Sequence, residues 1–302
     1  MKKILITGAT GFIGSTLFKH LEAQGHEIYV IDNLSFGNKD LINVKKENFF
    51  FQDIIDGPKV NSIINAIKPQ WVIHLAAIHF IPFCNENPML ASNTNIMGTR
   101  NVLKACESIE SIEKVFFAST AAVYPITDLP IKEIDPVCPL DIYGLSKLAG
   151  EHLCQEFNLR TNIPTIICRF FNAFGPNETN PHLIPTIQEQ ILNGNRRIKL
   201  GNLEPKRDFI HTSDMAKAVS LLLEKFTKGI DIFNLGQGIE YSVLEIVQSF
   251  ELAIGQKIQI EIDQNRVRKV ERMHLVADIT KIKEFINWEP KISINDGIIT
   301  LV

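Results

Sequence analysis

Tyr143 and Lys147 stand four residues apart within residues 141–159, whose composition predicts a helix. Residues i and i+4 share one face of a helix, so the phenol and the ammonium project together. A free tyrosine has a pKa of ~10, whereas a general base works best near the operating pH. Lowering that pKa by ~3 units requires ~4 kcal/mol of phenolate stabilisation, to which the Lys147 cation would contribute. The pair is therefore either a base for an alcohol proton or an ordinary surface pair.

Ser119 and Thr120 follow the apolar residues 115–118, which predict a buried strand. Ligands bind at the carboxyl ends of the strands of an open parallel sheet. A hydroxyl at this position would hydrogen-bond the same substrate oxygen that Tyr143 deprotonates. The alternative is a strand that simply ends in small polar residues.

Gly8, Gly11 and Gly14 have GxxGxxG spacing, directly after an apolar run and at the start of an amphipathic segment. Glycines let the backbone turn tightly and approach a pyrophosphate, and a helix N-terminus presents free N–H groups and a positive dipole end to that anion. The strand–turn–helix context favours a dinucleotide site over a glycine-rich turn without a ligand.

Asp32 lies 18 residues beyond Gly14, at the end of the next apolar run. An acid at this distance meets the adenosine ribose hydroxyls of a dinucleotide and would repel a 2′-phosphate, which favours NAD over NADP. The alternative role of Asp32 is that of a capping or turn residue. Asp53 and Ile54, after the third run, are weaker candidates for adenine contacts. The oxidised nicotinamide of NAD would help Lys147 to stabilise the phenolate.

Short apolar runs alternate with amphipathic segments through the first half of the chain. The runs are β-branched or aromatic without polar alternation, as expected for strands buried on both faces. They cover residues 4–6, 28–31, 49–51, 71–75, 115–118 and 165–168. This alternation predicts an α/β fold with a Rossmann-type doubly wound parallel sheet and helices on both faces.

The pattern changes after about residue 172. Helical patterns at 183–192, 213–226 and 242–252 are mixed with strand candidates at 198–200, 232–235 and 258–262. We therefore predict an NAD-binding Rossmann domain in residues 1–172, to which parts of 207–240 return. Residues 173–302 are predicted to form a smaller mixed α/β lobe that binds the substrate.

Composition excludes several classes of protein. The 302 residues are 45% hydrophobic and 22% charged, which excludes a disordered chain, and the net charge of −3 leaves no basic excess for a nucleic-acid partner. The apolar runs are shorter than the ~18 residues that suggest a membrane span. Five scattered cysteines without a CxxC pair predict reduced thiols in a cytoplasmic protein. His74, His79 and Cys84 lack metal-ligand spacing, so no metal site is expected.

Together these motifs resemble the extended short-chain dehydrogenase/reductase family, in its branch of nucleotide-sugar epimerases and dehydratases. The resemblance covers nearly the whole chain and extends to residues 75–77, 95–99, 169–172 and 207–211. Residues 32–37 resemble, in particular, the epimerases that retain NAD.

The resemblance implies a role for each matching position. Tyr143 would be the base, with Lys147 on the nicotinamide ribose, while Thr120, next to Ser119, would polarise the substrate. The diphosphate of the substrate would be gripped by Asn172, Arg207 and Arg268, because a guanidinium suits a pair of phosphate oxygens. The alternatives are that Arg207 pairs with Asp208 and that Arg268 belongs to a basic surface cluster. The residues implied to contact NAD are Gly8, Gly11, Phe12, Ile13, Gly14, Asp32, Asn33, Asp53, Ile54, Leu75, Ala76, Ala77, Asn95 and Lys147.

Two departures from the family pattern bear on the reaction type. Dehydratases of this family carry acids after the threonine, where this chain has Ala121 and Ala122, and methyl groups cannot do acid–base work. Residues 200–208 nevertheless resemble GDP-mannose dehydratases, and residues around His182 resemble GDP-fucose synthases, in which a histidine serves as an acid. His182 is therefore either a proton donor or a plain surface residue.

The leading hypothesis is an NAD-dependent epimerase that inverts C4 of a nucleotide-diphosphate hexose, such as a UDP-sugar, through a transient 4-keto sugar. The alternatives on the same scaffold are a 4,6-dehydratase and a 4-keto-sugar reductase. From another class, a non-catalytic dinucleotide sensor is also considered. The family implies a homodimer, with contacts from the helix that carries Tyr143 and the helix near residues 93–106.

Overall fold

The computed structural model describes residues 1–267 and 272–302. The chain forms two compact units, each assembled from separate stretches of sequence. The first unit comprises Met1–Pro125, Glu133–Phe170 and Ala216–Phe233, and the second comprises Ile126–Lys132, Phe171–Met215 and Asn234–Val302.

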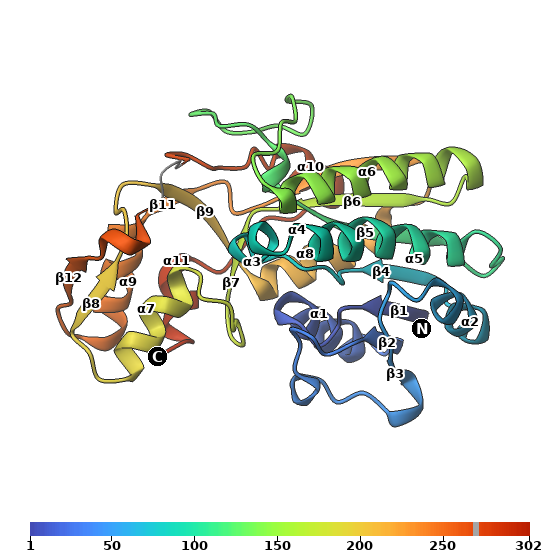
Figure 1. Cartoon of the computed structure of the whole chain (residues 1–302), viewed down its shortest axis with the longest axis horizontal. Helices are drawn as coiled ribbons and strands as arrows, with labels where there is room; N and C mark the ends of the chain where they lie inside the picture. The colour runs from blue at the N-terminus through green and yellow to red at the C-terminus, as the bar shows by residue number, and fades with distance from the viewer. Residues whose placement is uncertain (268–271) are drawn as a thin grey trace. The chain divides into compact units, whose positions relative to one another are not determined.

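The first unit is built on a seven-stranded sheet in the order β10-β6-β5-β4-β1-β2-β3. Figure 1 shows β6 to β3 in this order from top to bottom. Each neighbouring pair from β6 to β3 is parallel. Between β4 and β1 lies the topological switch point, because the chain builds outward from β1 to β3 on one side and from β4 to β6 on the other. The predicted α/β fold with a doubly wound parallel sheet is confirmed. The strands are β1 (Lys3–Thr7), β2 (Glu27–Asp32), β3 (Phe49–Phe51), β4 (Trp71–His74), β5 (Lys114–Thr120), β6 (Thr165–Phe170) and β10 (Ile230–Leu235).

Helices pack on this sheet through buried apolar side chains. On one face, Leu5, Val72 and Val115 share a buried cluster with side chains of α2, α5 and α6. Lys114, at the start of β5, donates through Nζ to the carbonyl oxygens of Leu223 and Phe226 at 2.6 Å each, which anchors the end of α8. The helices are α1 (Phe12–Ala23), α2 (Gly57–Ile67), α3 (Ile81–Glu86), α4 (Pro88–Ser92), α5 (Gly98–Cys106), α6 (Ile142–Thr161) and α8 (Thr212–Lys225), of which α8 begins in the second unit.

Local sequence determines where α6 begins and how closely it approaches the sheet. The Asp141 carboxylate accepts the Gly144 N–H at 2.7 Å, as an N-cap should. A Cβ on Gly144 would lie 2.5 Å from the Ala122 carbonyl oxygen, and one on Gly150 would lie 2.4 Å from the Phe117 ring. The two glycines therefore let α6 press against β5 and the turn that follows it, and Tyr143 lies in the first turn of that helix.

The second unit contains two small sheets, ordered β11-β9-β7 and β12-β8. Its core includes Phe174, Ile187, Phe209 and Phe250. Its strands are β7 (Asn172–Phe174), β8 (Arg197–Leu200), β9 (Lys206–His211), β11 (Glu240–Ser242) and β12 (Gln259–Ile262), and its helices are α7 (Leu183–Leu192), α9 (Val243–Ile254), α10 (Thr280–Ile286) and α11 (Ile294–Ile299).

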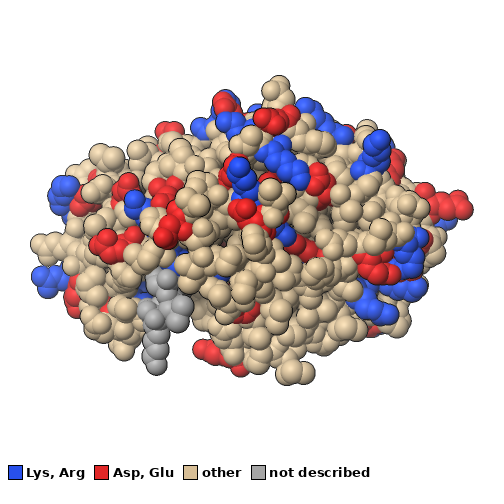
Figure 2. Space-filling model, turned by 90° about the horizontal axis from the view of Figure 1, so that it is seen from above, with Lys and Arg blue, Asp and Glu red and all other residues tan. Residues whose placement is uncertain are grey.

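The surface carries charges of both signs. Over the face in Figure 2, Lys and Arg side chains are interspersed with Asp and Glu. Among the residues that the structure describes, no helix combines the length and the apolar character that crossing a bilayer requires. All five cysteines are free thiols, and four of them are buried.

Candidate active site

In the glycine turn after β1, two of the glycines are required by the close packing of the protein's own backbone. Gly8 has a φ of +77°, and a Cβ there would lie 2.7 Å from the Ala76 backbone nitrogen. A Cβ on Gly14 would lie 2.2 Å from the Gly8 carbonyl oxygen. Either side chain would push the turn away from β4 or from α1.

Gly11 differs, because the protein leaves room for a side chain there. Its φ is −78°, and the nearest described atom to a Cβ is the Gly8 carbonyl oxygen at 3.4 Å, an ordinary contact. Within the described chain no side chain caps α1, whose first residues are Phe12 and Ile13. An open N-terminus with a free approach to its backbone fits a dinucleotide pyrophosphate.

Asp32 lies beside this turn at the end of β2, as the sequence predicts. It is 8% exposed, and its carboxylate accepts the N–H of Thr10 at 3.0 Å and that of Leu34 at 2.9 Å. Asn33 donates to the Asp53 carboxylate at 2.9 Å. Each carboxylate oxygen keeps a further lone pair, so this edge still has acceptors for ribose hydroxyls.

The other residues expected around NAD lie at the same edge of the sheet. Leu75, Ala76 and Ala77 follow β4, and Ala76 abuts Gly8. The Ile54 side chain packs so closely on Gly98 that a Cβ there would lie 2.4 Å from Ile54 Cδ1.

Asn95 is engaged by protein groups. It is 1% exposed, and its amide accepts the Ile78 N–H at 2.8 Å and donates to the Ile78 carbonyl and Ser146 Oγ at 2.9 Å each. These bonds tie the segment after β4 to α6.

Tyr143, Thr120 and Lys147 come together in the first unit. Thr120 is buried at the end of β5, and its hydroxyl hydrogen-bonds the phenol of the half-buried Tyr143. Lys147 is 3% exposed and donates through Nζ to the Ala118 carbonyl oxygen at 2.7 Å. Burial lowers the Lys147 pKa to about 8.

The expected lowering of the Tyr143 pKa combines Lys147 with the oxidised nicotinamide, and the groups of the protein alone do not produce it. Burial raises the pKa of Tyr143 above its ordinary value, and the hydrogen bond from Thr120 opposes that rise. The physical reason is that the ammonium is directed to the Ala118 carbonyl, while the phenol loses solvation. In the protein alone, the base is therefore held protonated.

Ser119 is not brought to Tyr143. Neighbouring residues of a strand point to opposite faces, and the Ser119 hydroxyl donates to Glu151 Oε1 at 2.5 Å. Glu151 forms a buried ion pair with Arg169, whose Nη2 lies 2.7 Å from Glu151 Oε2. Arg169 also donates to the Tyr124 hydroxyl at 2.8 Å.

This Ser119–Glu151–Arg169 network locks α6 against β5 and β6, and the sequence did not reveal it as a unit. The sequence contained part of the information needed to predict this network. Glu151 lies four residues after Lys147 on α6, and Arg169 interrupts an apolar strand.

The second unit holds residues expected to bind the substrate. Asn172 begins β7 and pairs with Phe209 of β9, two residues along that strand from Arg207. Arg207 donates through Nη1 to the carbonyl oxygens of Lys206 at 2.8 Å and Arg272 at 2.7 Å. Arg268 lies outside the described residues.

Two further polar groups of the second unit were weighed from the sequence. His182 precedes α7, with its Nδ1 against Glu178 Oε1. Asp208 directs its carboxylate to three backbone N–H groups of the same unit, those of residues 237, 238 and 277.

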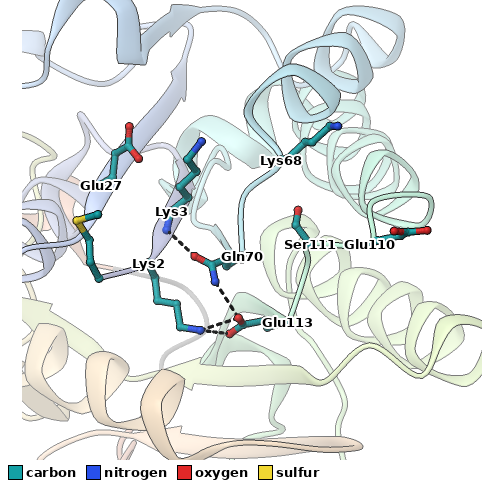
Figure 3. A pocket seen from close by; sticks show the side chains of 9 residues that line it. Lys2, Lys3, Glu27, Lys68, Gln70, Glu110, Ser111 and Glu113 are labelled. Atoms are coloured by element: carbon teal, nitrogen blue, oxygen red, sulfur yellow. Dashed lines mark hydrogen bonds and ion pairs between the residues drawn. The ribbon is translucent and has the colours of Figure 1, made fainter.

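A pocket of about 610 Å³ lies at the opposite edge of the large sheet, before β1, β4 and β5 (Figure 3). Lys2 donates to both Glu113 oxygens, at 2.6 and 2.7 Å, and Gln70 donates to Glu113 at 2.9 Å. These bonds join the amino ends of three strands, and none of the residues expected to act on a ligand lines this pocket.

A parallel sheet with a topological switch point, an open glycine turn and a Tyr–Lys pair define a dinucleotide-dependent enzyme. The model of the family described as GDP-mannose 4,6 dehydratase matches residues 5–301. The chain belongs to that family, the nucleotide-sugar epimerase/dehydratase branch of the extended short-chain dehydrogenases/reductases.

Individual relatives agree with the family assignment. The putative UDP-glucose 4-epimerase of Methanocaldococcus jannaschii is 34% identical over 300 residues, covering 98% of this chain and 95% of that protein. The UDP-glucose 4-epimerase of Thermotoga maritima, solved with UDP-glucose, superposes with a TM-score of 0.91 at 28% identity, covering 99% and 97% of the two chains. That of Thermus thermophilus, solved with NAD, gives a TM-score of 0.89 at 28% identity and the same coverage.

Proposed function

We propose that this enzyme interconverts C4 epimers of a UDP-hexose with NAD as its cofactor. The observation that carries the proposal is the hydrogen-bonded pair of Thr120 and Tyr143 at the carboxyl end of β5, with Lys147 buried one helical turn further on. The relatives named as UDP-glucose 4-epimerases support the choice of reaction and of nucleotide.

The proposed chemistry assigns one task to each of these side chains. Tyr143, once ionised, takes the proton of the C4 hydroxyl and returns it later to the 4-keto oxygen. Thr120 donates a hydrogen bond to the oxygen that carries the developing charge. Lys147 holds a positive charge beside the base and binds a ribose hydroxyl.

NAD, when bound, supplies the hydride acceptor and donor at C4. We place its pyrophosphate on Gly11, Phe12 and Ile13 and its adenosine ribose on Asp32 and Asn33. Asp53, Ile54, residues 75–77 and Asn95 would complete the wall of that site. The first unit thus serves as the NAD-binding domain.

The second unit would hold the nucleotide diphosphate. We propose that the diphosphate is bound by Asn172, Arg207 and Arg268. These contacts must persist while the keto sugar rotates to present its other face to the cofactor. His182 is proposed as an alternative proton donor. We place the start of the substrate lobe at residue 173, two residues after the main stretch of the second unit begins at Phe171.

A 4,6-dehydratase is the second candidate, because the matching family model carries that description. Removal of water across C5 and C6 needs an acid and a base near the sugar. After Thr120 this chain has Ala121 and Ala122, and Ala121 is 3% exposed. The epimerase is therefore favoured.

Assembly and location belong to the same proposal. We infer a homodimer through α6 and the helical segment 93–106, where Met97 and Leu145 are large exposed apolar side chains. Free thiols at all five cysteines support a cytoplasmic protein.

The test is an assay of the purified protein on a panel of UDP-, GDP- and dTDP-hexoses, with products resolved by NMR. We expect the C4 epimer of one or more UDP-hexoses and no consumption of reduced cofactor. Tyr143→Phe should lower kcat by about 10²- to 10⁴-fold while NAD binding is retained. A 4-keto-6-deoxy product would show that the enzyme is a dehydratase and not an epimerase. Full activity in the phenylalanine variant would show that Tyr143 is not the base.

A further inference from the structure

Two phenylalanines that the proposed reaction does not use meet above the glycine turn. Phe36 lies in the segment that follows β2, and Phe83 lies in α3, which follows β4. Their ring centroids are 5.4 Å apart and the ring planes are inclined by 80°, an edge-to-face contact.

The sheet order shows what this contact crosses. β1 lies between β2 and β4 and is parallel to both. Strands two places apart in a sheet are separated by ~10 Å. Rings that reach each other from the segments after β2 and β4 therefore bridge the end of β1, from which the glycine turn leads into α1.

Residues 33–37 are seated directly on that turn. The Asn38 N–H donates to the Thr10 carbonyl oxygen at 3.0 Å, and a Cβ on Gly37 would lie 1.9 Å from Thr10 Oγ1. The Asp32 carboxylate accepts N–H groups from both Thr10 and Leu34. One acid thus joins the turn to the segment that covers it.

The two halves of the contact differ in how firmly they are held. Phe83 packs with Ile78, Cys84 and Ala91, whereas Phe36 remains 47% exposed. Leu34 has a φ of 57°, a left-handed conformation that is unfavourable for a non-glycine residue. Strained residues of this kind occur at ligand clamps.

We propose that Phe36 and Phe83 form a clasp over the glycine turn that slows release of the bound dinucleotide. The clasp rests on the proposed function, because it requires NAD on the first unit. Phe83 is the fixed half, and Phe36 swings away with residues 33–37 by rotation at Leu34, which relaxes the strained φ. Epimerisation has no net redox change, so a cofactor that stays bound serves successive turnovers.

The test measures the release rate of NADH from the full-length protein. Protein loaded with NADH is mixed with excess NAD in a stopped-flow instrument, and the loss of bound NADH fluorescence is followed. We expect Phe36→Ala to raise the release rate about threefold to tenfold, the range that an aromatic pair supplies. Phe83→Leu, which keeps an apolar side chain in its cluster, should give a similar increase.

The double variant and a control separate the clasp from general loosening. Combining Phe36→Ala with Phe83→Leu should release NADH no faster than the faster single variant, because both changes remove one contact. Phe285→Ala, a partly exposed ring in the second unit, should release NADH at the wild-type rate.

Three results overturn the clasp, and they separate it from the proposed function. Wild-type release rates in both single variants, or effects that multiply in the double variant, overturn the clasp and leave the proposed function intact. A wild-type protein that binds no NADH overturns the clasp and the proposed function together.

Discussion

Thr120 is the residue through which the structure tunes the proposed base. Burial raises the Tyr143 pKa, and the Thr120 hydrogen bond lowers it. Because Tyr143 acts when ionised, activity should rise with pH on the acid limb. Thr120→Val removes the opposing hydrogen bond, so we expect this limb to move about 0.5–1 pH unit higher. The measurement is the pH profile of kcat/KM, and an unmoved or lowered limb contradicts the assignment.

Lys147 illustrates a charge that costs stability. Burial lowers its folded pKa to about 8, below the ~10.4 of an unfolded lysine. The unfolded state therefore binds more protons between these values, so this residue's contribution to stability is lowest below pH 8 and rises toward pH 10.4. At pH 7, Lys147→Met should raise the free energy of unfolding by about 1–2 kcal/mol while abolishing turnover.

Denaturant unfolding of the cofactor-free proteins at two pH values checks this expectation. The gain of the methionine variant should shrink at pH 10.5, where the folded wild-type lysine is neutral and about half of the unfolded lysine is neutral as well. A methionine variant that is less stable than wild type at pH 7 would show that the ammonium stabilises the fold.

At this scale, sequence predicted which residues lie near one another better than the hydrogen-bond partner of each. Tyr143, Thr120 and Lys147 were recognisable because helical spacing and the strand end place them at one edge. The hydrogen-bond partner of Ser119 was not, because a strand end offers two faces and only the packing of α6 decides which one carries Glu151. Likewise, nothing in sequence shows that Lys114 caps α8, a helix more than 90 residues away.

The glycine turn makes an element-scale prediction with a matched pair of variants. A Cβ on Gly14 would lie 2.2 Å from a backbone oxygen, whereas one on Gly11 meets only an ordinary contact at 3.4 Å. We expect Gly14→Ala to lower the melting temperature by several degrees. Gly11→Ala should unfold near the wild-type temperature but bind NAD about tenfold or more weakly, because the methyl group obstructs the pyrophosphate.

Differential scanning calorimetry and NAD titration of both variants provide the measurement. If Gly11→Ala binds NAD like wild type, the pyrophosphate does not lie on this turn.

Most elements were foreseeable because their periodicity is strong. The predicted helix at 183–192 and the six strands of the first half are present, and the apolar residues of most of them are buried on both faces or on one stripe. The edge strand β3 differs from the prediction of burial on both faces, because Phe51 is 70% exposed. The segment after β2 was not foreseeable as a cover for the turn. Its placement depends on a left-handed leucine and on Gly37 packing against Thr10.

The assembly of the whole molecule can be tested through exposed apolar side chains of the first unit. Leu145 on α6 is 54% exposed and Met97 is 43% exposed. If the proposed dimer uses this surface, Leu145→Arg combined with Met97→Arg should yield a monomer by light scattering. Leu252→Arg, on the 74% exposed side chain of α9, is the control that should leave the mass unchanged. A monomeric wild-type protein, or a doubly substituted dimer, contradicts this interface.

The reaction as a whole is tested most directly by the fate of the hydrogen at C4. Incubating the enzyme with UDP-glucose deuterated at C4 in ordinary water, and analysing the product by NMR, follows that atom through one inversion. The account predicts a galactose product that keeps its deuterium at C4, because the same hydride leaves and returns. Deuterium lost to water, or no C4 epimer at all, would contradict it.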